Sequence, residues 1–170
     1  TPSVLEVARR LSELRAVSEV FTHADAAVVE RAVSTVAGLS DLRSCTDEAS
    51  LTSSVVLPPD VQTRAAVDGV RVRLDSAKAL ERAGKYGLGL QTAASATAEA
   101  RALDYAPLLA EALVTEAGLL FQSGSTREAE TATAEAISVA AAGKHASVAA
   151  DAWVQLIALV GVEQAQHERA

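Results

Sequence analysis

Apolar residues recur in this chain at a fixed interval of 40 positions. The interval is seen in three columns: Leu74, Val114 and Val154; Ala77, Ala117 and Ile157; and Leu80, Leu120 and Val160. Arg73, Leu113 and Trp153 share the register, and Gly84 and Gly124 follow at the same interval. A period of about 20–50 residues is typical of arrays in which one supersecondary unit stacks on the next. We therefore expect a repeated pair of helices, an architecture that usually binds rather than catalyses.

The composition of the 170 residues favours helices and excludes some functions. Hydrophobic residues make up 49% and aromatic residues only 3%, and abundant alanine favours helices that approach closely. The net charge of −7 argues against nucleic-acid binding, because phosphate contacts need clustered Lys and Arg. No apolar stretch reaches the ~18 residues that span a bilayer, so we expect no direct membrane insertion. Since the chain has no Met and stops within a helix-like pattern, we expect a larger parent protein, membrane-anchored in one interpretation, whose localisation stays unassigned.

The first 59 residues are predicted to form a helical hairpin and an irregular loop. Apolar spacing indicates an amphipathic helix over Ser3–Phe21 and a second helix from an Asp25 cap to Ala37, ended by Gly38. We expect the second helix to bury Val28, Val29, Ala32, Val33 and Val36. Residues 41–60 break the pattern; they hold the single Cys45 and are predicted to form a crossing loop that ends at Pro58-Pro59.

The repeats are predicted to occupy residues 60–170, with the last one truncated. Asp60 is the expected N-cap of the first long helix. The predicted helices are Val61–Ala83, Gly87–Leu103, one that Pro107 opens and that ends near Ser123, Thr126–Ala142, and one that begins at Ala146. This makes about seven helices in the whole chain and no strand, an all-α fold.

The repeated pair resembles the tetratricopeptide repeat. With Gly84 as the turn glycine, the small first-helix position is Ala77, the large residue after the turn is Tyr86, and the small second-helix positions are Gly89 and Ala96. The equivalents around Gly124 are Ala117, Ala129 and Ala136, and Trp153 falls in an aromatic position of the third unit. The resemblance implies a right-handed αα-superhelix, or solenoid. The period of 40 exceeds the usual length of about 34, and a generic helical repeat is the alternative.

A second resemblance covers most of the chain. It is carried by the segments Leu11–Phe21, Ala24–Ala26, Val28–Val33, Leu42–Asp47, Ala83–Tyr86, Ala100–Tyr105, Ala152–Val154 and Val160–Gly161. These resemble the C-terminal region of a large group of bacterial serine/threonine protein kinases, in which a kinase domain and often a membrane-spanning helix come first. The resemblance implies a regulatory role in signal transduction. A cysteine commonly precedes the first helix in that group and none is present here, so the pairing of Cys45 stays open.

Nothing in the sequence forms a catalytic constellation. The chain lacks a glycine-rich phosphate loop, a His-Arg-Asp catalytic loop and an Asp-Phe-Gly triplet, so it cannot transfer phosphate alone. The three histidines, His23, His145 and His167, are too scattered for the ligand spacing of a metal site. We expect a chain that is not an enzyme and has no cofactor and no metal.

In the tetratricopeptide register a groove faces inward from the first helices. Its predicted lining is Arg71, Leu74, Lys78, Glu111, Val114, Phe121, Asp151 and Val154. The mixed apolar and charged character favours a protein or peptide partner; the alternative is that these residues pack within the chain. A structural spacer and a small-molecule sensor around Cys45 are two further interpretations. Because the last pair is incomplete, its open apolar face needs a cover, which is either a second helix of the parent protein or a second chain. We expect self-association into a homo-oligomer through Trp153, Ile157 and Val160.

Overall fold

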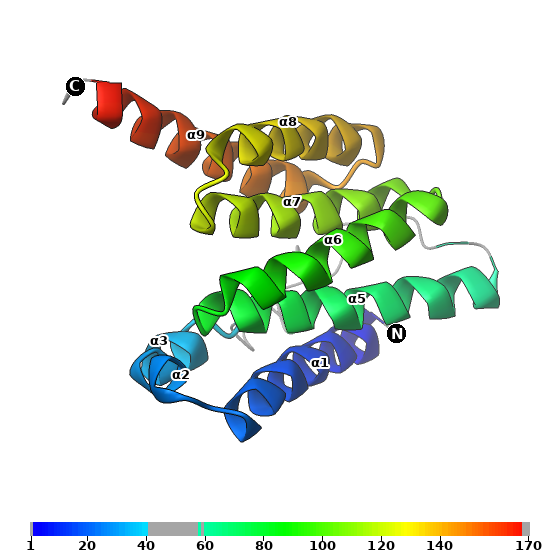
Figure 1. Ribbon diagram of the computed structural model, residues 1–170. Coiled ribbons are helices and arrows are strands. Elements are labelled where there is room, and N and C mark those ends of the chain that lie inside the picture. Colours follow the sequence, from blue (N-terminus) through cyan, green and yellow to red (C-terminus); the bar gives the residue numbers. More distant parts are fainter. Residues whose placement is uncertain (1, 41–57, 59, 168–170) are drawn as a thin grey trace.

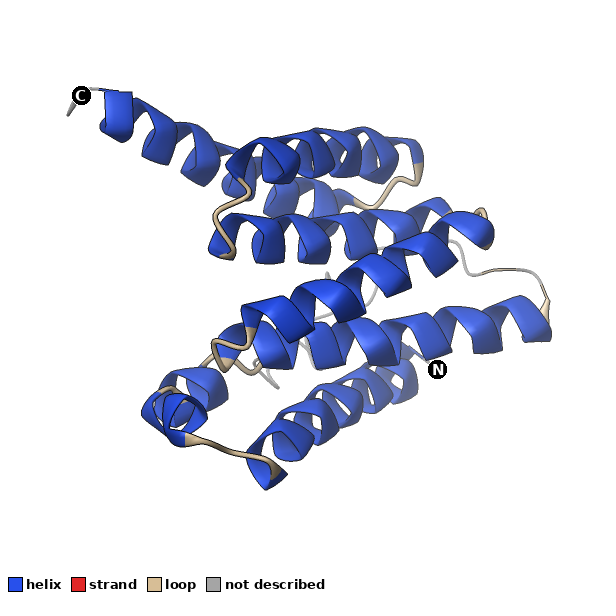
Figure 2. Ribbon diagram, viewed as in Figure 1, coloured by secondary structure: helices blue, strands red, loops and turns tan. Residues whose placement is uncertain are grey.

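The computed structural model describes residues 2–40, 58 and 60–167, and every regular element in this part is an α-helix (Figures 1 and 2). The predicted all-α class is therefore confirmed for the described residues. The crossing loop predicted around Cys45 lies outside them. The helices are α1 (Pro2–Thr22), α2 (Ala26–Glu30), α3 (Ala32–Ala37), α5 (Val61–Arg82), α6 (Tyr86–Ala102), α7 (Ala106–Gln122), α8 (Thr126–Ala142) and α9 (Ala146–His167).

From α5 onward the helices are joined by one kind of turn that recurs every 20 residues. Each turn contains a residue with positive φ: Gly84 at 78°, Asp104 at 48°, Gly124 at 84° and Lys144 at 53°. In three of the four turns, the next N–H reaches back to a carbonyl five residues earlier, as in a Schellman motif. These bonds are Lys85 to Leu80 (2.8 Å), Ser125 to Leu120 (2.9 Å) and His145 to Ala140 (2.9 Å). The 40-residue period of the sequence is thus two helices and two equivalent turns.

Each of these helices packs against the next one along the chain, and α7 also contacts both α5 and α9. Small residues let the backbones approach. Ala77 of α5 and Ala93 of α6 are fully buried together with Leu119 of α7. A Cβ added to Gly89 of α6 would lie only 2.8 Å from Leu119 Cδ2, so any larger residue there would force the buried Leu119 side chain to shift. The positions predicted to hold small residues at the helix crossings of both units are all buried: Ala77, Gly89, Ala96, Ala117, Ala129 and Ala136.

Two predicted N-caps are confirmed. The Asp60 carboxylate accepts a hydrogen bond from the Thr63 N–H (2.7 Å) at the start of α5. The Asp25 carboxylate accepts one from the Val28 N–H (3.1 Å) at the start of α2. In both cases the side chain satisfies one of the N–H groups that a first helical turn leaves without a partner.

The single helix predicted from Asp25 to Ala37 is wrong, because the chain breaks at Arg31 into α2 and α3. The predicted buried face is only partly correct. Val28 is buried and Ala32 is partly buried as predicted, but Val29, Val33 and Val36 are exposed, and Thr35 is buried in their place. Apolar spacing shows that a face exists, but charged contacts orient this segment here.

Those contacts fix α2 and α3 beside the α5–α6 turn. Asp25 pairs with Lys85, and the Arg31 guanidinium lies 5.7 Å from the centre of the Tyr86 ring. The α1 helix packs along α5, where Glu13 accepts a hydrogen bond from Arg82 Nη1 (2.8 Å). The N-terminal helices therefore attach to the first repeat through ion pairs as well as through apolar contact.

Candidate functional site

A buried ion cluster lies where α1, α5, α7 and the α8–α9 turn meet. Glu111 of α7 is only 7% exposed. Arg71 of α5 donates two hydrogen bonds to it, from Nε to Oε2 (3.1 Å) and from Nη2 to Oε1 (2.9 Å). His145 Nε2 lies 3.3 Å from Oε1, and Arg9 Nη2 of α1 lies 3.9 Å from Oε2. We call these four residues the Glu111 cluster.

The charge balance of the cluster keeps Glu111 ionised. Burial by itself raises the pKa of Glu111. The hydrogen bond with His145 and the charge and hydrogen bonds of Arg71 outweigh burial and lower the pKa to about 2. Burial likewise lowers the pKa of Arg71, but the charge of Glu111 more than restores it, so that the pKa is raised. A paired buried charge of this kind joins the helices that carry its partners, and removal of one partner would leave an uncompensated buried charge.

Ser147 adds a hydroxyl to the cluster, because its Oγ lies 3.2 Å from His145 Nδ1. A serine, a histidine and a carboxylate in sequence are the parts of a nucleophilic relay. Here, however, Arg71 neutralises the carboxylate. Ser147 and His145 line neither the hollow between α5 and α6 nor the one between α7 and α8. The arrangement therefore holds the start of α9 in place against α7.

The structure distributes the predicted groove residues over three environments. Arg71 and Glu111 are joined in the cluster. Leu74 is only 2% exposed and belongs to the core with Val67 and Val70, so its assignment to a groove is wrong. Its side chain fills the contact between α5, α6 and α7, as the apolar column itself requires. The others are partly buried or exposed: Lys78, Val114 and Phe121 are partly buried, and Asp151 and Val154 are exposed.

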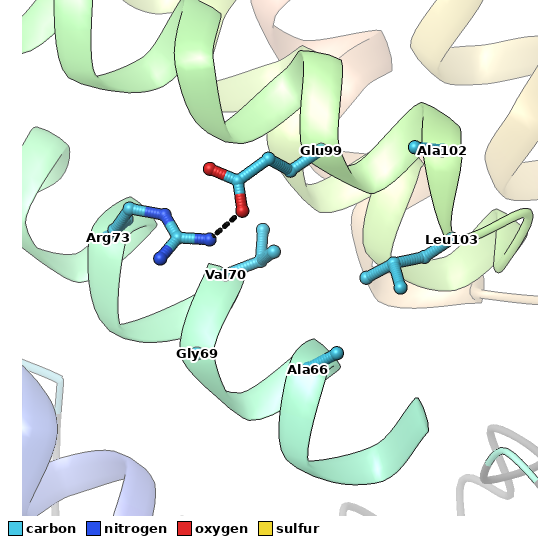
Figure 3. A pocket seen from close by; sticks show the side chains of 7 residues that line it. All are labelled: Ala66, Gly69, Val70, Arg73, Glu99, Ala102 and Leu103. Atoms are coloured by element: carbon cyan, nitrogen blue, oxygen red, sulfur yellow. Dashed lines mark hydrogen bonds and ion pairs between the residues drawn. The ribbon is translucent and has the colours of Figure 1, made fainter. Parts of the chain in front are cut away.

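A shallow hollow of about 330 Å³ opens between α5 and α6 (Figure 3). Its lining is mostly apolar, and the charged pair Arg73–Glu99 spans one side of it. Both charges are already engaged with one another, so they do not converge on a ligand. Specific small-molecule sites need several polar groups aimed into the cavity, and this hollow lacks them.

The described residues form neither a metal-binding cluster nor a membrane-spanning helix. Within these, no three His, Cys, Asp or Glu side chains come together in a group that could hold a metal ion. None of the helices described is both long and apolar enough to cross a membrane.

The predicted self-association residues lie on the outer face of α9. The exposed fractions are 53% for Trp153, 70% for Ile157 and 40% for Val160, and Val154 beside them is 68% exposed. The opposite face packs into the molecule, where Ala152 and Leu159 are fully buried. In Figure 1 the C-terminal half of α9 extends beyond α7 and α8. We call Trp153, Val154, Ile157, Val160 and Gly161 the α9 face.

Equivalent positions in the earlier units are covered by the helix that follows. Leu113, one period before Trp153, is 2% exposed and packs with Ala136 of α8. Arg73, two periods before, pairs with Glu99 of α6. Ala117 and Ala77, the equivalents of Ile157, are fully buried. The α9 face therefore lacks, within the described residues, the covering helix that its counterparts have.

Another exposed apolar line runs along α1 through Val7, Leu11 and Leu14. No repeated counterpart of α1 lies among the described helices, so nothing indicates what would cover this line. Of these two exposed apolar surfaces, only the α9 face has equivalent positions in other helices, α5 and α7, that show how such a surface is covered.

The sequence did not predict that His145 and Arg9 belong to the Glu111 cluster, or that Ser147 contacts it. A signal existed for its central pair, since Arg71 and Glu111 are opposite charges one full period apart. No comparable signal marked His145, which lies in a turn and reaches Glu111 only through the packing of α9 on α7.

Searches for relatives found none: no protein family, curated protein or solved structure matches this chain.

Proposed function

We propose that this chain is a non-catalytic protein-interaction module that docks a protein on the α9 face. The observation that supports it is the contrast between equivalent positions, since Ile157 is 70% exposed where Ala117 and Ala77 are fully buried. Large apolar side chains gathered on one exposed surface are characteristic of protein contact sites. Tryptophan, here Trp153, is one of the residue types that contribute most of the binding energy in such contacts.

For the finer fold we propose a tetratricopeptide-like solenoid. Its support is the regular succession of helices, with left-handed residues at Gly84 and Gly124 and small buried residues at the helix crossings. First helices α5, α7 and α9 contact one another in order, as in a stacked array. Solenoids commonly present extended surfaces to other proteins, which agrees with a docking role.

We further propose that the module belongs to the regulatory region of a bacterial serine/threonine kinase. This rests on the resemblance of segments such as Leu11–Phe21 and Ala100–Tyr105 alone. In that setting, docking on the α9 face would bring kinase chains together or hold them apart.

A spacer is the second candidate, and one observation favours it. The Glu111 cluster fills the inner column of the predicted groove with the chain's own side chains, and Arg9 of α1 joins it there. Side chains that are paired with one another in this way are not free to bind a peptide at that level. The spacer interpretation predicts that no protein contacts α9 either.

Photo-crosslinking distinguishes these functions. A photo-reactive amino acid replaces Ile157 on the α9 face or, as a control, Leu88, which is 59% exposed on α6. Both variants are irradiated as purified protein and after addition to a bacterial lysate. Protein adducts from position 157 that are absent from position 88, in either sample, support docking. Adducts from neither position in both samples would overturn the docking function in favour of the spacer.

A further inference from the structure

We propose that α1 is a detachable arm, which covers one face of α5 and leaves it in a local opening that does not unfold the repeats. The inference is independent of docking on the α9 face, because the two surfaces share no residue. It is carried by the kind of contact that joins α1 to α5 and by how little of α1 is buried.

The side of α5 that α1 covers is a stripe of charged residues. The stripe consists of Arg71, Asp75, Lys78 and Arg82. Its members are spaced by three or four residues, so they share one face of the helix. At one end, Glu13 of α1 accepts a hydrogen bond from Arg82 Nη1 (2.8 Å). At the other end, Arg9 Nη2 of α1 lies 3.9 Å from Glu111, the partner of Arg71. The arm therefore covers a part of the predicted groove, to which Arg71 and Lys78 were assigned.

Little apolar burial accompanies these ion pairs. Among residues 7–22, whose burial the structure describes, Val17 alone is buried. The apolar line of α1, Val7, Leu11 and Leu14, is exposed instead. By contrast, α5, α6, α7 and α8 each bury at least four residues. Since apolar burial stabilises a packed helix more than partly exposed ion pairs do, α1 is held less strongly than the repeats.

The repeats keep their own contacts when α1 leaves. Buried apolar residues of α5 pack with those of α6 and α7 in one core. Arg9 is the outermost member of the Glu111 cluster, with 53% of its side chain exposed, and Glu111 is paired with Arg71 and His145 without it. A helix of 21 residues without a support is marginal in water. The arm therefore loses its backbone hydrogen bonds on opening, whereas α5–α9 keep theirs.

Hydrogen exchange of the whole chain, read by mass spectrometry, tests for this opening. We expect amides in the middle of α1 to exchange at least about tenfold faster than those of α6–α8, after correction for intrinsic rates. Sodium chloride at about 0.5 M should speed exchange in α1 alone, because salt screens its ion pairs. A common rate for α1 and α6–α8 would overturn the inference, since α1 would then open only when the whole chain unfolds.

A matched pair of variants tests the ionic attachment. Glu13→Gln removes the charge that Arg82 binds and should speed exchange in α1 by about tenfold. Glu135→Gln breaks the Arg101–Glu135 pair between α6 and α8 instead and should leave exchange in α1 unchanged. Equal effects of the two variants on α1 would overturn the proposed attachment.

Thiol labelling at position 12 tests whether the opening uncovers the contact with α5. The Ser12 Oγ is buried; burial raises the pKa of Asp75 on α5, and the Ser12 hydroxyl lowers it in part. In a background with Cys45→Ser, Ser12→Cys should react slowly with neutral iodoacetamide, and faster once Glu13→Gln is added. Leu11→Cys, on the exposed line, is the control that should react rapidly in both backgrounds. A thiol at position 12 that reacts only at the rate of global unfolding would overturn the inference.

Discussion

Two of the four residues with positive φ in the turns after α5, α6, α7 and α8 are not glycine. Asp104 and Lys144 adopt the same left-handed conformation as Gly84 and Gly124. A side chain in this region costs about 1–2 kcal/mol, because Cβ crowds the following carbonyl oxygen. The four equivalent turns are therefore not equally strained.

Lys144→Gly should stabilise the protein by about 0.5–1 kcal/mol, since relief of the strain exceeds the entropy that glycine adds to the unfolded chain. Gly124→Ala should destabilise it by about 1 kcal/mol for the same reason. No atom lies within 4 Å of a Cβ built at Gly124, so crowding does not contribute. Urea unfolding measures both changes. Effects of the same sign would contradict the account of the turns.

The Glu111 cluster concerns a few residues but joins four segments. Glu111→Gln should destabilise the protein by about 3–5 kcal/mol at pH 7, because it leaves the Arg71 guanidinium buried without its counter-charge. The double variant Arg71→Met/Glu111→Leu should recover most of that loss, since both charges are removed together. A double variant as unstable as the single one would show that the cluster does more than balance charge.

The lowered pKa of Glu111 predicts how stability depends on pH. The folded-state pKa of about 2 lies below the ordinary value of 4.5. The stability that Glu111 contributes is therefore complete above about pH 4.5 and is lost as the pH falls toward 2, by about 3 kcal/mol in all. Burial raises the pKa values of Asp75 and Glu81, which act in the opposite direction.

The measurement is chemical unfolding between pH 2 and 7 of the wild type and of Arg71→Met/Glu111→Leu. Asp75 and Glu81 are present in both proteins, so their contribution cancels in the difference. The wild type should lose more stability than the double variant in acid. Free energies of unfolding that fall in parallel would contradict the assignment.

At the scale of the element, the sequence predicted the bounds of α5, α6 and α7 to within one residue, and it predicted Thr126–Ala142 and the start of α9 at Ala146 without error. Turn glycines and a strong apolar period specify these elements locally. The segment from Asp25 to Ala37 was predicted less well, because contacts with Lys85 and Tyr86, distant in sequence, orient it. For the candidate site, too, the sequence predicted what the local apolar period specifies and missed what contacts distant in sequence determine. The sequence assigned Arg71 and Glu111 to one groove without pairing them, and it assigned Leu74 to the same groove although the apolar column to which Leu74 belongs indicates a core position.

Two glycines at the start of α6 give a matched test of helix packing. Gly89→Ala should destabilise the protein by about 1–3 kcal/mol, because the new Cβ would clash with Leu119. Gly87→Ala, two residues earlier and open to solvent, should stabilise it by up to about 1 kcal/mol through helix propensity. Thermal unfolding compares the two. Equal effects would mean that the close approach of α6 is not what requires glycine.

At the scale of the whole molecule, the interior and the surface have separate roles. The buried Glu111 cluster links α1, α5, α7 and the start of α9 into one body. The α9 face stands outside this body and carries the single tryptophan of the chain. Substitutions on the α9 face can therefore test binding without changes to the buried interior. A protein that binds the α9 face of the folded chain should also raise its free energy of unfolding, as any ligand specific to the folded state does.

The fluorescence of Trp153 tests the central claim most directly, because the emission of the only tryptophan reports on the α9 face itself. In a dilute monomer the indole is half exposed and should emit at long wavelength. As protein concentration rises, we predict a shift to shorter wavelength that Ile157→Glu abolishes and that Val72→Glu, at an exposed position of α5, leaves unchanged. An emission maximum that stays constant over the whole concentration range would contradict the self-association expected through Trp153, Ile157 and Val160.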